Sequence, residues 1–406
     1  MTRNRQQFVL DLMIDHMLAE PRGTSEPCTL KWDPTKLKLL ECFKNYEFKD
    51  LPKLEKLKEF LKDPVASEAA RRTEFLDVWN TALLTPEDTK WIRSSFTNVT
   101  RLDVWVGNGW DTGLSAFHDL FPNVKSLVVK FDVVRLTDLS AFLCSFSKLE
   151  YLCICGEKIE KTDEDGNYIR HSTPRVFTGT LKLKCGLEGI TSLFSGTSIK
   201  PCFQNISWKI NPGETNEATQ WLTVLVESCS STLKSITIRH YPNNGIAPAS
   251  FGSIQTYSGS DDGVLPPASP PVDPVDLSKA TSLEGVVLQY DLNNPQWLTR
   301  SLEKLPSENK SFEQISIRLP TLAGCYWETY PLCTELDDVL VRLSDSGKIR
   351  TKAIYTGGEE RMAEGFVERV FPKMRKRGKL ELIVRDISKY SKSSSSGNVV
   401  ELGDLD

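Results

Sequence analysis

The 406-residue sequence lacks the residue patterns that most enzymes and metal proteins carry. It has four histidines and no Cys-x-x-Cys pair among its ten cysteines, so neither residue type offers the spacing of a zinc site. The phosphate-binding Gly-x-x-x-x-Gly-Lys loop, the Gly-x-Ser-x-Gly nucleophile turn and the His-Glu-x-x-His motif are all missing from it. We therefore expect no catalytic residue, no metal ligand and no cofactor in this chain.

The chain also lacks a long apolar run and an excess of either charge. The best candidate for a signal or membrane segment, residues 8–18, is short and contains Asp11 and Asp15, so we expect neither a bilayer span nor a signal peptide. The 50 Lys and Arg residues against 54 Asp and Glu residues leave a net charge of −4, which gives no general attraction to nucleic acid or membranes. Scattered cysteines favour reduced thiols, so we predict a cytoplasmic or nuclear protein.

A repeated segment gives the strongest positive signal. Thr112-Gly-Leu-Ser-Ala-Phe117 returns 25 residues later as Thr137-Asp-Leu-Ser-Ala-Phe142. Each copy leads into the spacing Φ-x-x-Φ-x-Φ, where Φ is an apolar side chain, and the last two Φ alternate as in a strand with one buried side. Each copy therefore predicts a short helix followed by a strand, a unit that buries its apolar side only against a stacked copy of itself.

The strand half of this unit recurs along the chain. Seven segments carry the full spacing, beginning at Val99, Val124, Leu149, Phe203, Leu233, Leu283 and Phe312. Looser versions are Leu181 with Leu183, Ile349 with Ile354, and Leu380 to Val384. The fold class we predict is α/β: an irregular leucine-rich-repeat solenoid of parallel strands and short helices, preceded by an all-helical module. The alternative is an α/β domain with a mixed sheet.

Composition divides the chain into three parts. Residues 1–95 show apolar helical stripes without strand spacing, including a predicted helix over 66–84, so they predict an all-helical module. Residues 96–386 hold the repeats, interrupted by a Pro-, Gly- and Ser-rich insertion at 243–276 that predicts a loop. Residues 387–406 are polar and acidic and predict a disordered tail.

The run Val9-Leu-Asp-Leu-Met-Ile-Asp-His-Met17 resembles the opening helix of an F-box, and the whole arrangement is similar to the fungal F-box/leucine-rich-repeat proteins. The resemblance implies that Val9, Leu12, Met13 and Met17, on a helix at 8–18, bind the Skp-type adaptor of a cullin–RING ubiquitin ligase. In that family the repeat face selects the substrate and the receptor itself does no chemistry. Gln6 and Phe8 depart from the family motif, so this F-box is divergent. An amphipathic helix that caps the end of the array explains the same residues.

Stacked parallel strands would align one outward residue per strand, just after the third Φ. Five of the eight residues at that position are basic in an acidic protein. The row reads Trp105, Lys130, Cys155, Lys184, Lys209, Arg239, Gln289 and Arg318. Like charges on neighbouring strands, about 4.8 Å apart, repel one another, so the row predicts an acidic or phosphorylated partner on the concave face. The alternative is a solvated face whose charge is cancelled by acids off the row.

Taken together, the sequence predicts a protein-binding adaptor and not an enzyme. The candidate role is a substrate receptor of a cullin–RING ligase that holds its target on the concave repeat face. The alternative is a stand-alone leucine-rich-repeat interaction scaffold with no role in ubiquitin transfer. Nucleic-acid binding is disfavoured because Trp105 is the single aromatic residue in the row that could stack on bases.

Overall fold

The structure, a computed structural model, describes most of the chain between residues 43 and 385. The described residues are 43, 45–48, 51–79, 84–106, 121–160, 174–184, 189–195, 198–210, 216–240, 273–289, 295–305, 309–319, 333–345, 349–356 and 360–385. The chain divides into two compact units, Met1–Pro201 and Cys202–Asp406, and each unit is described by itself. Both are α/β.

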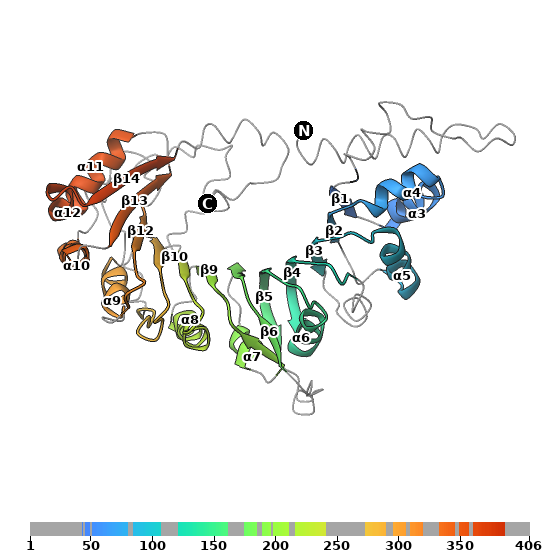
Figure 1. Cartoon of the computed structure of the whole chain (residues 1–406), viewed down its shortest axis with the longest axis horizontal. Helices are drawn as coiled ribbons and strands as arrows, with labels where there is room; N and C mark the ends of the chain where they lie inside the picture. The colour runs from blue at the N-terminus through green and yellow to red at the C-terminus, as the bar shows by residue number, and fades with distance from the viewer. Residues whose placement is uncertain are drawn as a thin grey trace, which may run out of the picture. The chain divides into compact units, whose positions relative to one another are not determined.

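The N-terminal unit contains a parallel sheet whose strands follow one another in sequence order, with helices along one face (Figure 1). Its strands, among the described residues, are β1 (Asn45–Phe48), β2 (Phe75–Trp79), β3 (Arg101–Val106), β4 (Ser126–Arg135), β5 (Tyr151–Glu160) and β7 (Thr180–Lys184). Its helices are α3 (Leu51–Phe60), α4 (Pro64–Arg71), α5 (Pro86–Ser95), α6 (Leu136–Cys144) and α7 (Ile190–Ser195). A separate two-stranded sheet pairs β6 (Arg175–Phe177) with β8 (Ile199–Pro201).

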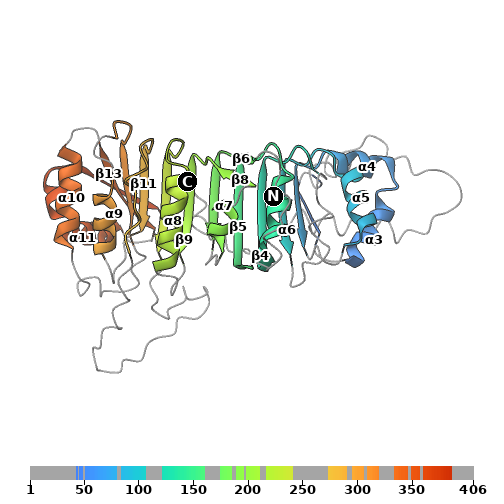
Figure 2. The ribbon, with the colours of Figure 1, turned by 90° about the horizontal axis from the view of Figure 1, so that it is seen from below.

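The C-terminal unit is built in the same way, again with parallel strands in sequence order and helices along one face of them (Figure 2). Its described strands are β9 (Asn205–Ile210), β10 (Ser235–His240), β11 (Gly285–Gln289), β12 (Gln314–Arg318), β13 (Arg350–Thr356) and β14 (Leu380–Arg385). Its described helices are α8 (Asn216–Ser228), α9 (Gln296–Glu303), α10 (Thr334–Asp345), α11 (Glu360–Val370) and α12 (Pro372–Lys376).

The core of each unit consists of columns of apolar side chains, one residue from each strand. Leu102, Leu127 and Leu152 are Cα partners across β3, β4 and β5, and all three are buried. In the C-terminal unit, Ile236 and Val286 are partners in the same way. Burying one such side chain contributes about 1.5–3 kcal/mol. The Φ-x-x-Φ-x-Φ spacing therefore identified the buried face correctly in these strands.

The strands begin with the same hydrogen-bond pattern from one strand to the next. The Thr100 carbonyl accepts the amides of Lys125 and Ser126 at 2.8 and 3.1 Å. The Lys125 carbonyl accepts those of Glu150 and Tyr151 at 2.7 and 2.9 Å. In the C-terminal unit, the carbonyls of Lys234 and Glu284 accept two amides each in the same manner. The shared pattern means that each strand starts in register with the strand before it.

The prediction of an all-helical module over residues 1–95 is wrong, because β1 and β2 lie within that range and extend the sheet. The predicted helix over 66–84 is wrong as well: α4 ends at Arg71 and β2 follows. Leu76 and Val78 of β2 are Cα partners of Leu102 and Val104, so β2 has the same two inward positions as the other strands. The sequence pattern missed β2 because Thr73, a fully buried polar residue, stands where the first Φ is expected.

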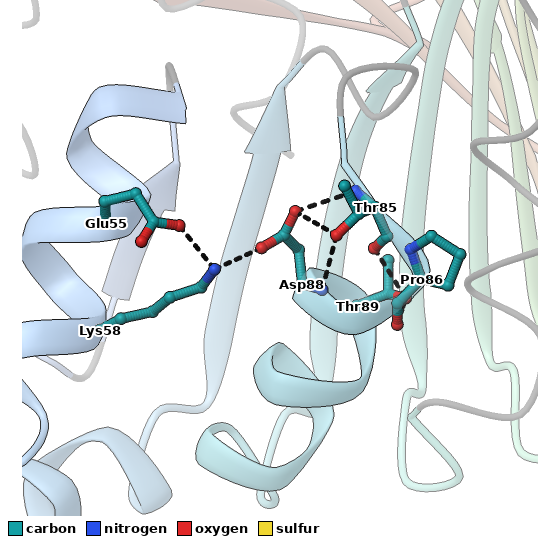
Figure 3. A network of polar contacts seen from close by, with 6 residues as sticks. All are labelled: Glu55, Lys58, Thr85, Pro86, Asp88 and Thr89. Carbon is teal, nitrogen blue, oxygen red and sulfur yellow. Dashed lines mark hydrogen bonds and ion pairs between the residues drawn. The ribbon is translucent and has the colours of Figure 1, made fainter.

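A polar network joins α3 to α5 in this first part of the unit (Figure 3). Thr85 and Asp88 form a capping box at the start of α5: Asp88 N donates to Thr85 Oγ1 at 3.1 Å, and Thr85 N donates to Asp88 Oδ2 at 2.9 Å. Lys58 Nζ of α3 donates to the other Asp88 oxygen at 2.5 Å and to Glu55 at 2.6 Å. Burial opposes ionisation of Asp88, but the hydrogen bonds from Lys58 and Thr85 outweigh it and lower the pKa of this carboxyl group.

Three predictions fall wholly or mostly outside the described residues: the helix at 8–18, the insertion at 243–276 and the tail at 387–406. The described end of the insertion, residues 273–276, packs against the unit, because Val275 is fully buried and its amide donates to Ser301 Oγ at 3.2 Å. Of the helices that the structure describes, none is long and apolar enough to cross a membrane.

Candidate binding surface on the outward strand face

The face of each sheet that is turned away from the helices carries the candidate site, and we call it the outward face. In the N-terminal unit, Trp105, Lys130, Cys155 and Lys184 are successive Cα partners across β3, β4, β5 and β7. The predicted alignment of this row is therefore confirmed within the unit. Lys130, Cys155 and Lys184 are half-buried. Their side chains share this face because each residue directly follows an inward apolar residue, and neighbouring residues of a strand point to opposite faces of the sheet.

The row also contains a tryptophan that the sequence pattern did not find. Trp79 of β2 is the Cα partner of Trp105, and their rings pack edge to face with centroids 4.5 Å apart. Both rings are half-buried. Trp79 could have been found only by recognising β2, whose first apolar position is occupied by Thr73. The two rings pack against each other edge to face, an arrangement worth about 0.5–1.5 kcal/mol beyond the area they bury.

Charge changes sign along the outward face of this unit. Asp77 and Asp103 are Cα partners on β2 and β3 and both are buried, with Arg101 Nε 3.5 Å from Asp103 Oδ1. On the other side of the unit, Lys182 and Lys184 project from β7. The outward face therefore runs from acidic and aromatic on β2 and β3 to basic on β7.

The C-terminal unit carries the more uniform half of the row. Lys209 and Arg239 are Cα partners on β9 and β10, and Gln289 and Arg318 are partners on β11 and β12. Across these four strands the outward positions hold three basic residues and no carboxylate. Beyond Arg318 the row turns apolar, since its partner on β13 is the buried Ile354.

Arg239 differs from the expectation that every side chain in the row is exposed. It is only 8% exposed, whereas Lys209 beside it is half-buried. Lys209 and Arg239 are Cα partners on neighbouring strands, whereas Lys184 belongs to the other unit.

The face offers charge and hydrogen-bond donors for binding. Within the part of the chain that the structure describes, no three His, Cys, Asp or Glu side chains come close enough together to hold a metal ion. Guanidinium and ammonium groups at strand spacing suit carboxylate or phosphate groups, and an arginine can bind either group through two parallel hydrogen bonds. Val9, Leu12, Met13 and Met17, which were predicted to bind an adaptor, lie outside the described residues.

Comparison with known proteins adds no family to this picture: no protein-family model matches the chain, and no curated protein matches its sequence.

Proposed function

We propose that this chain is a protein-binding protein of the leucine-rich-repeat type that holds an acidic or phosphorylated segment of its partner on the outward face. The repeat interpretation is supported in each unit by parallel strands in sequence order, by helices along one face and by the recurring hydrogen bonds at the strand starts. The observation that carries the binding proposal is the row on β9 to β12, with three basic residues and no carboxylate at the outward positions.

Charge of this kind favours an elongated anionic segment over a small molecule. Successive row positions are about 4.8 Å apart, so an extended peptide that lies across the strands meets a new side chain at each strand. Each cation adds a modest, salt-sensitive contribution, and several together raise both affinity and association rate. Lys209 and Arg318 are both half-buried, so a partner can reach these two cations of the row.

The test uses an array of acidic peptides, with and without phosphorylation, and a double variant in which Lys209 and Arg318 are changed to Gln. Both side chains are half-buried and their loss should leave the fold intact. We expect the variant to bind the best peptide about tenfold more weakly and to lose most of the salt dependence.

A matched control removes equal charge away from the row. Lys125→Gln and Lys234→Gln each remove an exposed lysine that precedes a strand and pairs at 3.0 Å with Glu150 or Glu284. The control should bind as the wild type does. Equal weakening in both variants would show that only net charge matters, and unchanged binding in the row variant would place the binding surface elsewhere. Preference for a single-stranded oligonucleotide over every peptide would favour the nucleic-acid alternative instead.

A role as substrate receptor of a cullin–RING ligase is the more specific form of this proposal, and it rests on the F-box resemblance of Val9 to Met17 alone. Because β1 and β2 join the sheet, the element that binds the adaptor would have to lie before β1. Removal of residues 1–96 would therefore be a poor test, since it also strips β2 from the edge of β3.

Two substitutions in the full chain test the adaptor directly. Leu12→Asp and Met13→Asp should abolish binding of a Skp-type adaptor while peptide binding on the outward face persists. If the wild-type chain shows no adaptor binding at micromolar concentration, the stand-alone scaffold becomes the proposed role.

A further inference from the structure

A pair of thiols lies on the outward face of the N-terminal unit, and one of them belongs to the row described above. Cys153 and Cys155 are two residues apart on β5, so their side chains point to the same side of the sheet. Their Sγ atoms are 3.6 Å apart, and both are free cysteines. Cys153 is 2% exposed, whereas Cys155 is half-buried. The structure thus holds two thiols in contact, one of which solvent reaches.

Positive charge surrounds this pair on both neighbouring strands. Cys155 has Lys130 of β4 and Lys184 of β7 as its Cα partners, and Cys153 has Lys182 of β7. The hydrogen bond from Cys155 lowers the pKa of the Cys153 thiol; burial opposes that effect, and the ammonium groups of Lys184 and Lys182 reinforce it. Nearby lysines and a donated hydrogen bond are the conditions that favour a thiolate.

Two other thiols show the contrast. Burial raises the pKa of Cys144, and it raises the pKa of Cys229 to about 12. Each of these buried thiols stays protonated and unreactive at neutral pH. The pair on β5 therefore differs from Cys144 and Cys229 in the lysines on its neighbouring strands and in its contact between two sulfur atoms.

We propose that Cys153 and Cys155 form a modification site that a hydroperoxide oxidises to an intramolecular disulfide, with Cys155 as the accessible thiol and Cys153 as its resolving partner. Lys130 and Lys184, the Cα partners of Cys155, place positive charge beside the accessible sulfur. This inference does not depend on the proposed partner binding.

The reaction balances with the peroxide as the sole oxidant. The Cys155 thiolate attacks one peroxide oxygen, so that an S–O bond forms and the O–O bond breaks, and the departing alkoxide or hydroxide takes up a proton. Cys153 sulfur then attacks the sulfenic sulfur: the S–S bond forms, the S–O bond breaks and water leaves. Two thiols are oxidised and one hydroperoxide is reduced to an alcohol, or to water, with a further water released.

The geometry favours a bond that is easily reduced. Residues two apart on a strand have Cα atoms about 6.6 Å apart, close to the upper limit for a disulfide, and their Cβ atoms must move closer together, so closing the bond requires β5 to shorten locally. A disulfide at that limit is more easily reduced than a structural one, so dithiothreitol should reopen it quickly. A metal clamp is the competing use of two thiols. It is disfavoured because the described residues bring no third His, Cys, Asp or Glu ligand to the pair.

The experiment treats the reduced full chain with hydrogen peroxide below one equivalent, blocks the remaining thiols with N-ethylmaleimide and analyses tryptic peptides by mass spectrometry. Trypsin releases residues 149–158 as one peptide that contains both cysteines. We expect the disulfide form of this peptide, which carries no maleimide group and is two hydrogen atoms lighter than the dithiol, to form first. It should form about tenfold faster than Cys202, a half-buried reference thiol, is oxidised. Dithiothreitol should restore the dithiol.

Variants separate this site from a generally accessible cysteine. Lys182→Gln with Lys184→Gln should slow closure several-fold, whereas Lys125→Gln, which removes a lysine paired with Glu150, should not. In Cys153→Ser, dimedone should trap a sulfenic acid on Cys155. The proposal is overturned if Cys202 is oxidised first or if the 149–158 peptide becomes cross-linked to another cysteine. It is also overturned if the disulfide closes at the same rate in the Lys182/Lys184 double variant and in Lys125→Gln.

Discussion

Replacing Leu127 by alanine tests the register of the N-terminal sheet most directly. Leu127 is fully buried in β4, with Leu102 and Leu152 as its Cα partners on the two neighbouring strands. Truncation to alanine removes three carbon groups from the core, which costs about 2.4 kcal/mol at ~0.8 kcal/mol for each group. The cavity left between two ordered neighbours adds to that cost, so we expect a total loss of about 2–5 kcal/mol in the free energy of unfolding.

Urea titration followed by tryptophan fluorescence measures this loss, since Trp79 and Trp105 lie in the same sheet. The matched control is Lys130→Ala, three residues along the same strand and half-buried on the outward face. It should change the free energy of unfolding by no more than about 0.5 kcal/mol. Equal losses for the two variants would refute the assignment of the inward and outward faces. A change of urea slope in Leu127→Ala alone would indicate that part of the unit unfolds separately.

Three further predictions concern stability. Gly179→Ala should cost about 3 kcal/mol in the free energy of unfolding, because Gly179 has φ +80° and an added Cβ would lie 2.0 Å from the Glu150 carbonyl oxygen. Gly378→Ala, where φ is +62° but an added Cβ meets open space, should cost about 1 kcal/mol. Thermal unfolding measures both losses, and equal losses would contradict this reasoning. Asp88→Asn should cost about 1 kcal/mol in the free energy of unfolding at neutral pH. Because the pKa of Asp88 is lower in the folded state, its stabilising contribution is present above the unfolded-state pKa and is lost as the pH falls through the folded-state pKa. The stabilities of wild type and variant should therefore converge in acid, and a difference that stays constant with pH would contradict this. Arg239→Glu should destabilise the C-terminal unit by more than 1 kcal/mol while Lys209→Glu stays within about 0.5 kcal/mol, because Arg239 is buried and Lys209 is not; equal effects in urea titration would contradict this.

Much of the sheet could be predicted from the sequence because burial on one side of a strand imposes a strict period of two. Leu127 with Val129 and Leu152 with Ile154 both follow that period, and both pairs are aligned as expected. The pattern failed where a polar residue could be buried in place of an apolar one. β2 was missed in this way because Thr73 takes the place of an apolar residue. In β13 the inward residues are Thr351, which is polar, and Ala353, which is small, and not the predicted Ile349 with Ile354.

The alignment of the outward row could be predicted for the same reason, since it follows from the register of the buried residues. What could not be predicted was how deeply each side chain in the row is covered. Arg239 and Lys209 occupy equivalent positions in sequence, yet only the first is buried, because coverage depends on side chains from other strands. Cys153 and Cys155 were within reach of the sequence, since Cys-x-Cys in a strand places both thiols on one face. Their lysine neighbours were not, because these follow from strand pairing.

The inward and outward residues of each strand have different physical requirements, so the fold alone does not determine which residues stand on the outward face. An inward position such as Leu102 or Ile236 is surrounded by its column and by helices, so apolar volume is almost its sole requirement. An outward position contacts chiefly the same position on the next strand, so one substitution changes a single step of the row and leaves the core unaltered. The basic row on β9 to β12 spans four strands that are separate in sequence, and neither the core nor the strand pairing requires it. An anionic segment that lies across β9 to β12 would contact Lys209 and Arg318 together, and this is the role that we propose for the row.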